Sequence, residues 1–109
     1  MSKSRAKGTA METAVVKFCQ ENGFPYAERR ALAGSLDKGD ITGIPGVMIE
    51  VKNCAKITLA QWADEVEVQT KNAGADIGVL WIKRRGKNVA GSYVMMDPAT
   101  FIKLTKDRD

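Results

Sequence analysis

The sequence predicts an α/β fold with a mixed central β-sheet flanked by helices. Apolar residues recur at helical spacing in three segments, and strand-like runs lie between these segments. The expected order is helix, three strands, helix, two strands, helix. With 109 residues, 44% of them hydrophobic, the chain is long enough for one compact domain and too short for two ordinary ones.

The N-terminal part of the chain predicts a basic arm followed by a helix. Residues 1–8, MSKSRAKG, are small and basic, and we expect a flexible arm that touches a phosphate backbone. Apolar residues then recur at helical spacing from Thr9, the expected cap, to Asn22-Gly23, which ends the helix. Residues 9–109 form the single expected domain.

After this helix, Phe24, Tyr26 and the ERRAL stretch at residues 28–32 predict a strand that leads into a basic loop around Gly34-Ser35, and a β-hairpin follows. In GDITGIPGVMIEVKN, apolar and polar residues alternate on both sides of a turn signal at residues 43–46. Val47, Ile49 and Val51 are expected to pack against a helix, while the residues between them line a surface.

The second half predicts a helix over residues 59–73, a strand at 77–82 that is covered on both faces, and a short strand at 93–96. A last helix follows. The residues typical of helix ends are Thr58, Gly74, Asp97 and Pro98. The expected inward residues of the 59–73 helix are Leu59, Trp62, Ala63, Val66 and Thr70.

Composition narrows the function classes. The chain has no histidine, which excludes a catalytic His and His zinc ligands, so a hydrolase built from it depends on carboxylates, lysine and a hard metal ion. The net charge of +4 and a pI near 9.2 favour a polyanionic partner.

The cysteines and the hydropathy pattern indicate a compartment. Cys19 and Cys54 form no C-x-x-C pair and lie among apolar or small residues, as reduced, partly buried thiols do. No apolar run approaches the roughly 18 residues of a membrane helix, and the N-terminus lacks the apolar stretch of a signal peptide. We expect a soluble cytoplasmic protein without a membrane partner.

Three residues carry the expected chemistry. Glu50 and Lys52 are two apart on a strand, so both leave the same face of the sheet, about 6.6 Å apart. A three-residue loop at 44–46 sets Asp40 opposite Glu50, with Cβ atoms about 5 Å apart, close enough to share one cation of Mg²⁺ size. A two-residue loop would instead set Asp40 opposite Ile49.

Two carboxylates and one ammonium suit phosphodiester hydrolysis. A metal can lower the pKa of water, and Lys52 can orient that water or offset charge on the phosphate. An acid and a lysine two apart on a strand are also common at a solvated edge. The added hairpin aspartate, the apolar opposite face and the basic chain favour catalysis.

These residues resemble a known family. GDITG followed by VMIEVKN resembles the D and E-x-K motifs of PD-(D/E)XK nucleases, and KGTAMETAVVKFCQENGF resembles the opening helix of archaeal-type and phage-encoded Holliday-junction resolvases. The likeness covers most of the chain. It implies a restriction-endonuclease-like core, Mg²⁺ with Mn²⁺ as a substitute, no small-molecule cofactor, and a homodimer that cuts four-way DNA junctions in a cytoplasm, nucleoid-associated or in a phage's host.

The resemblance also implies roles for further residues. Glu12 would join Asp40 and Glu50 at the metal, although Thr9 to Glu12 also reads as a capping box. Gln61 is a candidate accessory residue with the same alternative. Gly39 departs from the family, because many members have proline there.

The residues expected at DNA are basic ones from the arm and loops together with one serine from the loop before Asp40. Residues 83–87, KRRGK, read equally well as a solvated hairpin tip or a phosphate clamp. Trp62 and Trp81 are expected in the core. The expected DNA contacts are Lys3, Arg5, Lys7, Arg29, Arg30, Ser35, Lys83, Arg84, Arg85 and Lys87.

The sequence thus predicts a metal-dependent, structure-selective DNA endonuclease of the Holliday-junction resolvase type. One alternative is a PD-(D/E)XK nuclease that cuts nicked, flap or duplex DNA. Another is a basic DNA-binding protein without catalysis, which would use only the positively charged surface.

Overall fold

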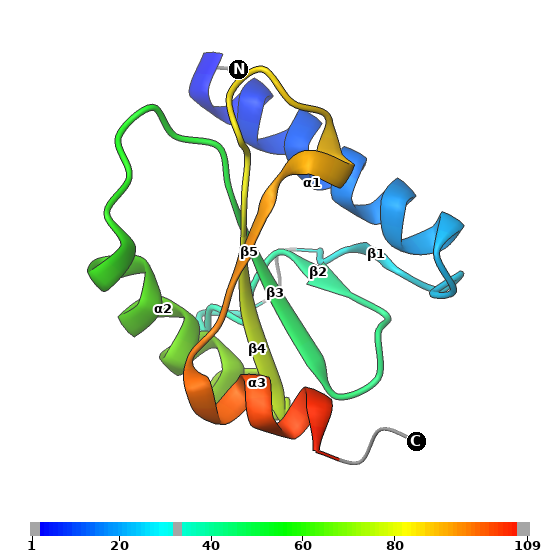
Figure 1. Cartoon of the computed structure of the whole chain (residues 1–109), viewed down its shortest axis with the longest axis vertical. Coiled ribbons are helices and arrows are strands. Elements are labelled where there is room, and N and C mark those ends of the chain that lie inside the picture. Colours follow the sequence, from blue (N-terminus) through cyan, green and yellow to red (C-terminus); the bar gives the residue numbers. More distant parts are fainter. Residues whose placement is uncertain (1–2, 32–33, 107–109) are drawn as a thin grey trace.

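A computed structural model describes residues 3–31 and 34–106 (Figure 1). These residues form one five-stranded sheet in the order β1-β2-β3-β4-β5, with helices packed on both faces. β3 and β4 are parallel, and the other neighbouring strands are antiparallel. The predicted α/β class, the mixed sheet and the order of elements are confirmed.

The described residues contain three α-helices, one 3-10 helix and five strands. None of the described helices is both long and apolar enough to cross a membrane. The elements are α1 (Lys3–Glu21), β1 (Glu28–Arg29), β2 (Ile41–Thr42), β3 (Val47–Lys52), α2 (Leu59–Asn72), β4 (Ile77–Ile82), the 3-10 helix η1 (Val89–Gly91), β5 (Tyr93–Met95) and α3 (Pro98–Thr105).

α1 begins earlier than the sequence predicts. Residues 3–8, expected as an arm, belong to the helix, so Thr9 lies inside α1 and does not cap it. Lysine, alanine and arginine favour a helix, and a single Gly8 costs only about 1 kcal/mol. Residues 1 and 2 of the expected arm lie outside the described residues. The helix ends as predicted, with Gly23 at a φ of 104°.

The first strand is shorter than predicted, and β1 covers only Glu28–Arg29 within the predicted segment. Phe24 and Tyr26 are exposed, and pairing begins only at β1, where Glu28 lies opposite Thr42. The segment before β1 packs closely on the hairpin turn. A Cβ atom on Gly43, whose φ is 92°, would lie 1.9 Å from the Tyr26 carbonyl oxygen. Only glycine fits at this contact.

Two hydrophobic clusters lie on opposite faces of the sheet. The α2 cluster consists of Trp62, Leu80 and Ile82, with Val66 and Met95 beside it. β4 contributes to both clusters, which confirms that it is covered on both faces, and both tryptophans contact the core as predicted. The buried residues of the α1 cluster are Met11, Val15, Cys19, Ala27, Ile41, Ile44, Ile49, Val51, Ile77 and Val79.

The predicted helix ends are partly confirmed. Gly74 follows α2 with a φ of 64°, whereas Thr58 forms no side-chain cap. The Asp97 carboxylate caps α3 by accepting a 2.8 Å hydrogen bond from the Thr100 amide, and this contact lowers the pKa of Asp97. The Cys54 thiol is exposed, not partly buried as expected, because it lies in the loop after β3.

The expected inward face of α2 needs one correction. Trp62 is buried there as predicted, but Leu59 and Ala63 are exposed. The buried stripe of α2 is rotated toward Gln69, which the sequence analysis had placed on neither face. This rotation brings a polar side chain beneath the helix, next to β3.

Candidate active site

β3 places Glu50 and Lys52 on the face of the sheet that α2 covers. Met48, two positions before Glu50 and on the same face of β3, is fully buried, and Leu80 lies beside Glu50 on β4. Glu50 is only 7% exposed, and the Lys52 side chain is 21% exposed. The prediction that this face lines an open surface is therefore wrong. α2 covers it because Trp62 and its apolar neighbours pack there.

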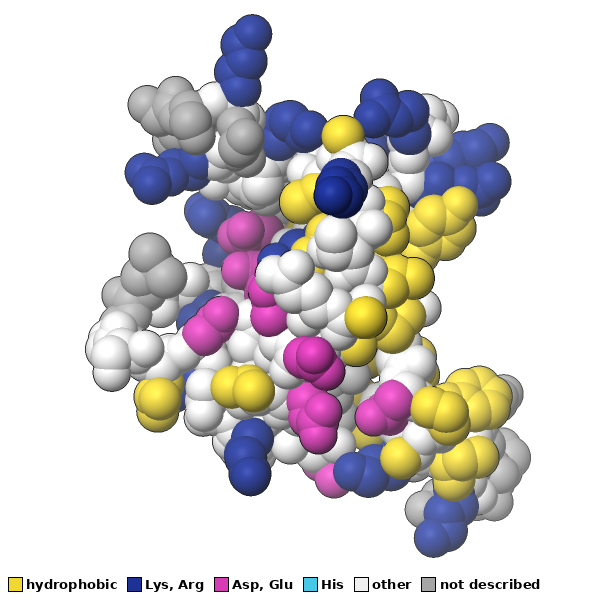
Figure 2. Space-filling model, turned by 90° about the vertical axis from the view of Figure 1, so that its left-hand side faces the viewer, with side chains coloured by type: hydrophobic (Ala, Val, Ile, Leu, Met, Phe, Trp, Pro, Cys, Tyr) yellow, Lys and Arg dark blue, Asp and Glu magenta, His cyan; other side chains and the backbone are white. Residues whose placement is uncertain are grey.

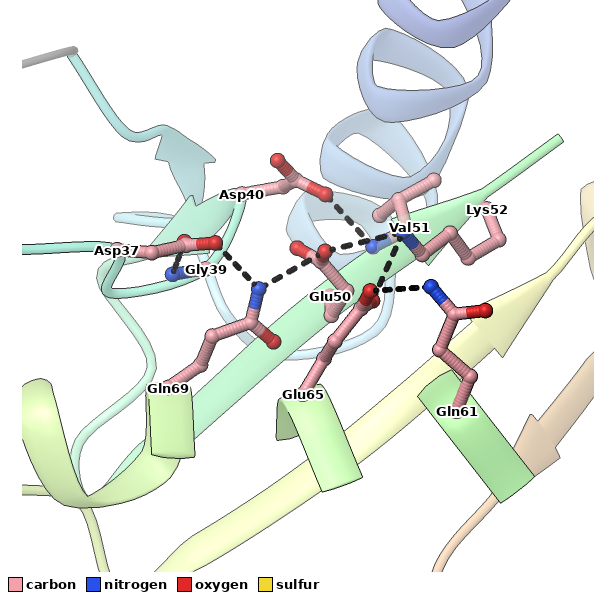
Figure 3. A network of polar contacts seen from close by, with 9 residues as sticks. All are labelled: Asp37, Gly39, Asp40, Glu50, Val51, Lys52, Gln61, Glu65 and Gln69. Atoms are coloured by element: carbon pink, nitrogen blue, oxygen red, sulfur yellow. Dashed lines mark hydrogen bonds and ion pairs between the residues drawn. The ribbon is translucent and has the colours of Figure 1, made fainter. Parts of the chain in front are cut away.

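The hairpin register brings Asp40 next to Glu50, as the three-residue loop predicts. Ile41 pairs with Ile49, and the same antiparallel register sets the preceding residue, Asp40, opposite Glu50. The Asp40 carboxylate accepts a 2.8 Å hydrogen bond from the Val51 amide (Figure 3). Both main-chain polar groups of Asp40 form hydrogen bonds. The Asp40 amide donates to the Ile49 carbonyl, and the Asp40 carbonyl accepts from the Arg30 amide.

The backbone conformation at Gly39 excludes a proline at this position. Its φ of 87° lies outside the range that proline can adopt. A Cβ atom there would lie 2.4 Å from the Met48 sulfur. Glycine thus lets the chain approach β3 closely just before Asp40.

The Glu50 carboxyl group lies in an environment that disfavours its charge. Burial, followed by the neighbouring Asp40, raises its pKa to about 8, while Gln69 and Lys52 act in the opposite direction. Two carboxylates side by side under a helix repel each other when both are ionised. A cation between them would remove both the repulsion and the burial penalty.

Lys52 lies among groups that hold its charge in place. Its ammonium is 3.5 Å from Glu50 Oε2 and 3.2 Å from Glu65 Oε2, and it lies 5.6 Å from the centre of the Trp62 ring. Burial lowers the pKa of Lys52, but Glu50 and Glu65 raise it by more, so the net shift is upward. Lys52 therefore stays protonated.

Glu12 belongs to the site and not to a helix cap. α1 begins nine residues before it, so the capping box predicted from Thr9 does not form. Glu12 Oε1 instead accepts a 3.1 Å bond from the Arg29 guanidinium. Burial, followed by the charge of Asp40, raises the pKa of Glu12. The capping box predicted from Thr58 to Gln61 is absent as well, and the Gln61 amide donates to Glu65 at 3.4 Å.

The sequence analysis missed three polar residues of the site. They are Gln69, Asp37 and Glu65. The Gln69 amide donates hydrogen bonds to Glu50 and Asp37, and Glu65 forms an ion pair with Lys52. A signal for Gln69 exists, because it follows Val66 by three residues and Trp62 by seven, and these spacings place all three side chains on one helical face. Asp37 and Glu65 carry no comparable signal.

A cavity of about 750 Å³ opens at this site, and seven of the fourteen predicted site residues line it. Both acidic and basic side chains line it. Lys52 does not line the cavity, and Lys38, which was not predicted, does. The predicted residues on its wall are Arg5, Glu12, Arg29, Arg30, Ser35, Asp40 and Glu50.

The other predicted basic residues lie elsewhere. A second hollow of about 490 Å³ is lined by Lys7, Lys83, Arg84 and Arg85, and none of the described acidic side chains lines it. The Arg84 guanidinium lies over the Tyr93 ring, and the Lys83 ammonium donates to the Lys87 carbonyl. Lys3 and the Lys87 side chain are exposed and line neither hollow.

The candidate metal ligands form an incomplete set. Within residues 3–31 and 34–106, no group of three or more Asp, Glu or Cys side chains is arranged to hold a metal ion. Asp40 and Glu50 are thus a pair of candidate ligands, with Glu12 on the wall of the same cavity. Comparisons of the chain with protein-family models, curated proteins and solved structures gave no match.

Proposed function

We propose that the chain is a metal-dependent DNA endonuclease of the PD-(D/E)XK type, with a restriction-endonuclease-like core, that cuts four-way junctions. One observation supports this most: the buried Glu50 lies beside Asp40 on the neighbouring segment, with the Lys52 ammonium 3.5 Å away. A buried carboxylate beside a second, half-buried one is costly for a fold. Binding of a cation accounts for it.

The residues fit a hard divalent cation. Asp40 and Glu50 supply oxygen ligands, which Mg²⁺ and Mn²⁺ prefer, and Glu12 offers a further carboxylate on the cavity wall. A bound Mg²⁺ would supply Lewis acidity toward the phosphate and activate water. The pKa of Glu50 is raised to about 8, and a cation bound beside the Glu50 carboxyl group would stabilise its ionised form.

Lys52 supplies a positive charge at a fixed position. Glu50 and Glu65 hold its ammonium from two sides, and Trp62 shields it from solvent. A protonated lysine held in this way can donate a hydrogen bond to the attacking water or offset the negative charge that develops on phosphate oxygens. Its fixed position reduces the reorganisation needed during the reaction.

The surroundings of the site suit a nucleic acid backbone. Figure 2 shows Lys and Arg side chains around the upper end of the molecule, above a group of Asp and Glu side chains. The Arg30 and Lys38 side chains line the catalytic cavity, and the second hollow contributes cations that form no ion pair among the described residues. Phosphate contacts of this kind position DNA without reading its bases.

The junction and the homodimer rest on the sequence resemblance. A four-way junction offers two equivalent strands, which match a two-fold symmetric enzyme with two sites. α3 carries an apolar surface that suits a subunit contact, because Phe101, Ile102 and Leu104 are each about half exposed.

A panel of junction, flap, nicked and linear DNA with Mg²⁺ tests this proposal. We expect paired cuts in the junction and far slower cutting of linear duplex. If linear duplex is cut at the same rate as the junction, the chain is not a junction resolvase but a nuclease with another substrate. EDTA should abolish cleavage but leave junction binding in place.

A DNA-binding protein without catalysis is the second candidate. The second hollow favours it, because four cations gather there with no acidic neighbour on its wall. This candidate predicts that Glu50→Gln and Lys52→Ala change no activity. The nuclease predicts that both lose cleavage and keep junction binding, which an electrophoretic shift assay beside the cleavage assay would distinguish.

A further inference from the structure

The side-chain amide of Gln69 joins two carboxylates from different parts of the chain. Its Nε2 group donates a 2.8 Å hydrogen bond to Asp37 Oδ2 and a 2.9 Å hydrogen bond to Glu50 Oε2 (Figure 3). Gln69 is only 2% exposed on α2. Both N–H groups of this amide are therefore used inside the protein.

The orientation of this amide is set by the two carboxylates. The Gln69 Oε1 atom is buried and has no hydrogen-bond partner among the described groups. Rotating the amide by half a turn would place that oxygen against two acceptors, Asp37 and Glu50, and would break both bonds. The protein thus leaves one carbonyl unpaired and keeps two contacts to the acidic groups.

The Asp37 end of this bridge fixes one wall of the catalytic cavity. Asp37 Oδ1 accepts from the Gly39 amide at 3.0 Å, and the Asp37 carbonyl accepts from Asn72 Nδ2 at 2.9 Å. Residues 34–39 line the cavity and are tied to α2 through these bonds. α2 therefore holds this wall through two side chains, Gln69 and Asn72.

The Glu50 end of the bridge fixes one oxygen of the carboxyl group. Glu50 Oε2 is held by Gln69 and lies 3.5 Å from the Lys52 ammonium. A cation shared with Asp40 would then use Oε1. Outer hydrogen bonds of this kind fix the direction in which a carboxylate presents its free oxygen.

We propose that Gln69 is a positioning residue that couples the wall formed by residues 34–39 to the cation-binding oxygen of Glu50. This inference rests on the proposed role of Glu50 as a metal ligand. Movement of the wall, through Asp37, would shift the Gln69 amide and with it Glu50. Occupation of the cavity wall by a phosphate backbone and binding of the cation would then strengthen each other.

Mn²⁺ binding, measured by calorimetry in the absence of DNA, tests the Glu50 end. Gln69→Met keeps the length of the side chain and removes both hydrogen bonds, and we expect about 10- to 100-fold weaker Mn²⁺ binding. The control is Gln20→Met on α1. It removes a 2.9 Å hydrogen bond from the Gln20 amide to the Ala27 carbonyl and should leave Mn²⁺ affinity unchanged. Equal affinity of wild type and Gln69→Met would overturn the proposal.

The exposed Asp37 gives a second variant that does not disturb the core. Asp37→Ala should weaken Mn²⁺ binding by about three- to tenfold, and this loss should disappear in a Gln69→Met background if the effect passes through Gln69. Additive losses would overturn the coupling. Circular dichroism would confirm that each variant is folded.

Hydrogen exchange of the Gly39 amide separates this proposal from the nuclease itself. In protein without cation or DNA, Gln69→Met should speed exchange at Gly39, because its acceptor Asp37 loses a partner, and Gln20→Met should not. Faster exchange and weaker Mn²⁺ binding would stand even if the wild type cut no DNA. Unchanged Gly39 exchange would contradict the coupling whatever the activity.

Discussion

The two faces of β3 differ in chemistry although they belong to one six-residue strand. Toward α1, Ile49 and Val51 pack in an apolar cluster with no acidic member. Toward α2, the fully buried Met48 is followed by Glu50 and Lys52, which contact polar side chains of the helix. One face therefore anchors the strand, and the other carries ionisable groups at fixed positions.

The stability of the apolar face explains how the fold can tolerate a buried carboxyl group on the other face. Each aliphatic side chain buried against α1 stabilises the fold by roughly 1.5–3 kcal/mol. Burial of the Glu50 carboxyl group opposes folding when it is ionised, which is why its pKa rises to about 8. The apolar face offsets the cost of the polar one, so substitutions on the two faces should separate stability from activity.

Glu50→Gln should have the largest effect, which falls on cleavage. The amide keeps the shape of the side chain but is a poor metal ligand, so we expect junction cleavage to fall at least ~1,000-fold, which corresponds to about 4 kcal/mol. Single-turnover cleavage with Mg²⁺ measures this loss. Glu67→Gln, on the exposed side of α2, is the matched control. Full activity of Glu50→Gln would remove this face from catalysis.

Ile49→Ala should lower stability and not cleavage. It removes a side chain that is 97% buried in the α1 cluster, since 3% is exposed, and should lower the free energy of unfolding by about 2–5 kcal/mol. Cleavage per folded molecule should change little. Urea unfolding measures the loss, with the exposed Val68→Ala as a control. A stable Ile49→Ala with lost cleavage would show that the two faces are not separate.

The pH dependence of stability should also come from the α2 face. Between the usual glutamate pKa of 4.5 and about 8, folded Glu50 holds a proton that the unfolded chain has lost. Without divalent cations, stability should therefore fall as pH rises through this range, by on the order of 2–4 kcal/mol. Glu50→Gln should lack this fall. Urea unfolding at pH 5, 6.5 and 8 measures it, and a parallel fall in Glu50→Gln would assign it to another group.

Much of this comparison can be predicted from the sequence. Alternation along residues 47–52 separates the two faces of β3, and the turn at 44–46 sets the register that brings Asp40 to Glu50. Burial of Glu50 cannot be predicted in this way, because it depends on how α2 lies over the sheet. Strong helix formers before Thr9 extend α1 where polarity alone indicates an arm. Asp37 lies in a loop whose position follows from tertiary contacts.

Gly78→Ala should have the smallest effect and tests how closely α2 must approach the polar face. Gly78 lies on β4 opposite Met48, and a Cβ atom there would lie 1.8 Å from Thr70 Oγ1 on α2. The helix must shift outward, which should lower stability by about 1–3 kcal/mol. Because Gln69 and Glu65 move with the helix, cleavage should fall as well.

The partner substitution makes this prediction specific. Thr70→Ala removes the closest of the clashing atoms, so Gly78→Ala with Thr70→Ala should regain part of both the stability and the cleavage rate. Urea unfolding and single-turnover cleavage of the single and double variants measure this. If Gly78→Ala lowers stability but leaves cleavage unchanged, the contacts from α2 are not needed to hold Glu50 and Lys52. The polar face of β3 would then function without its helix.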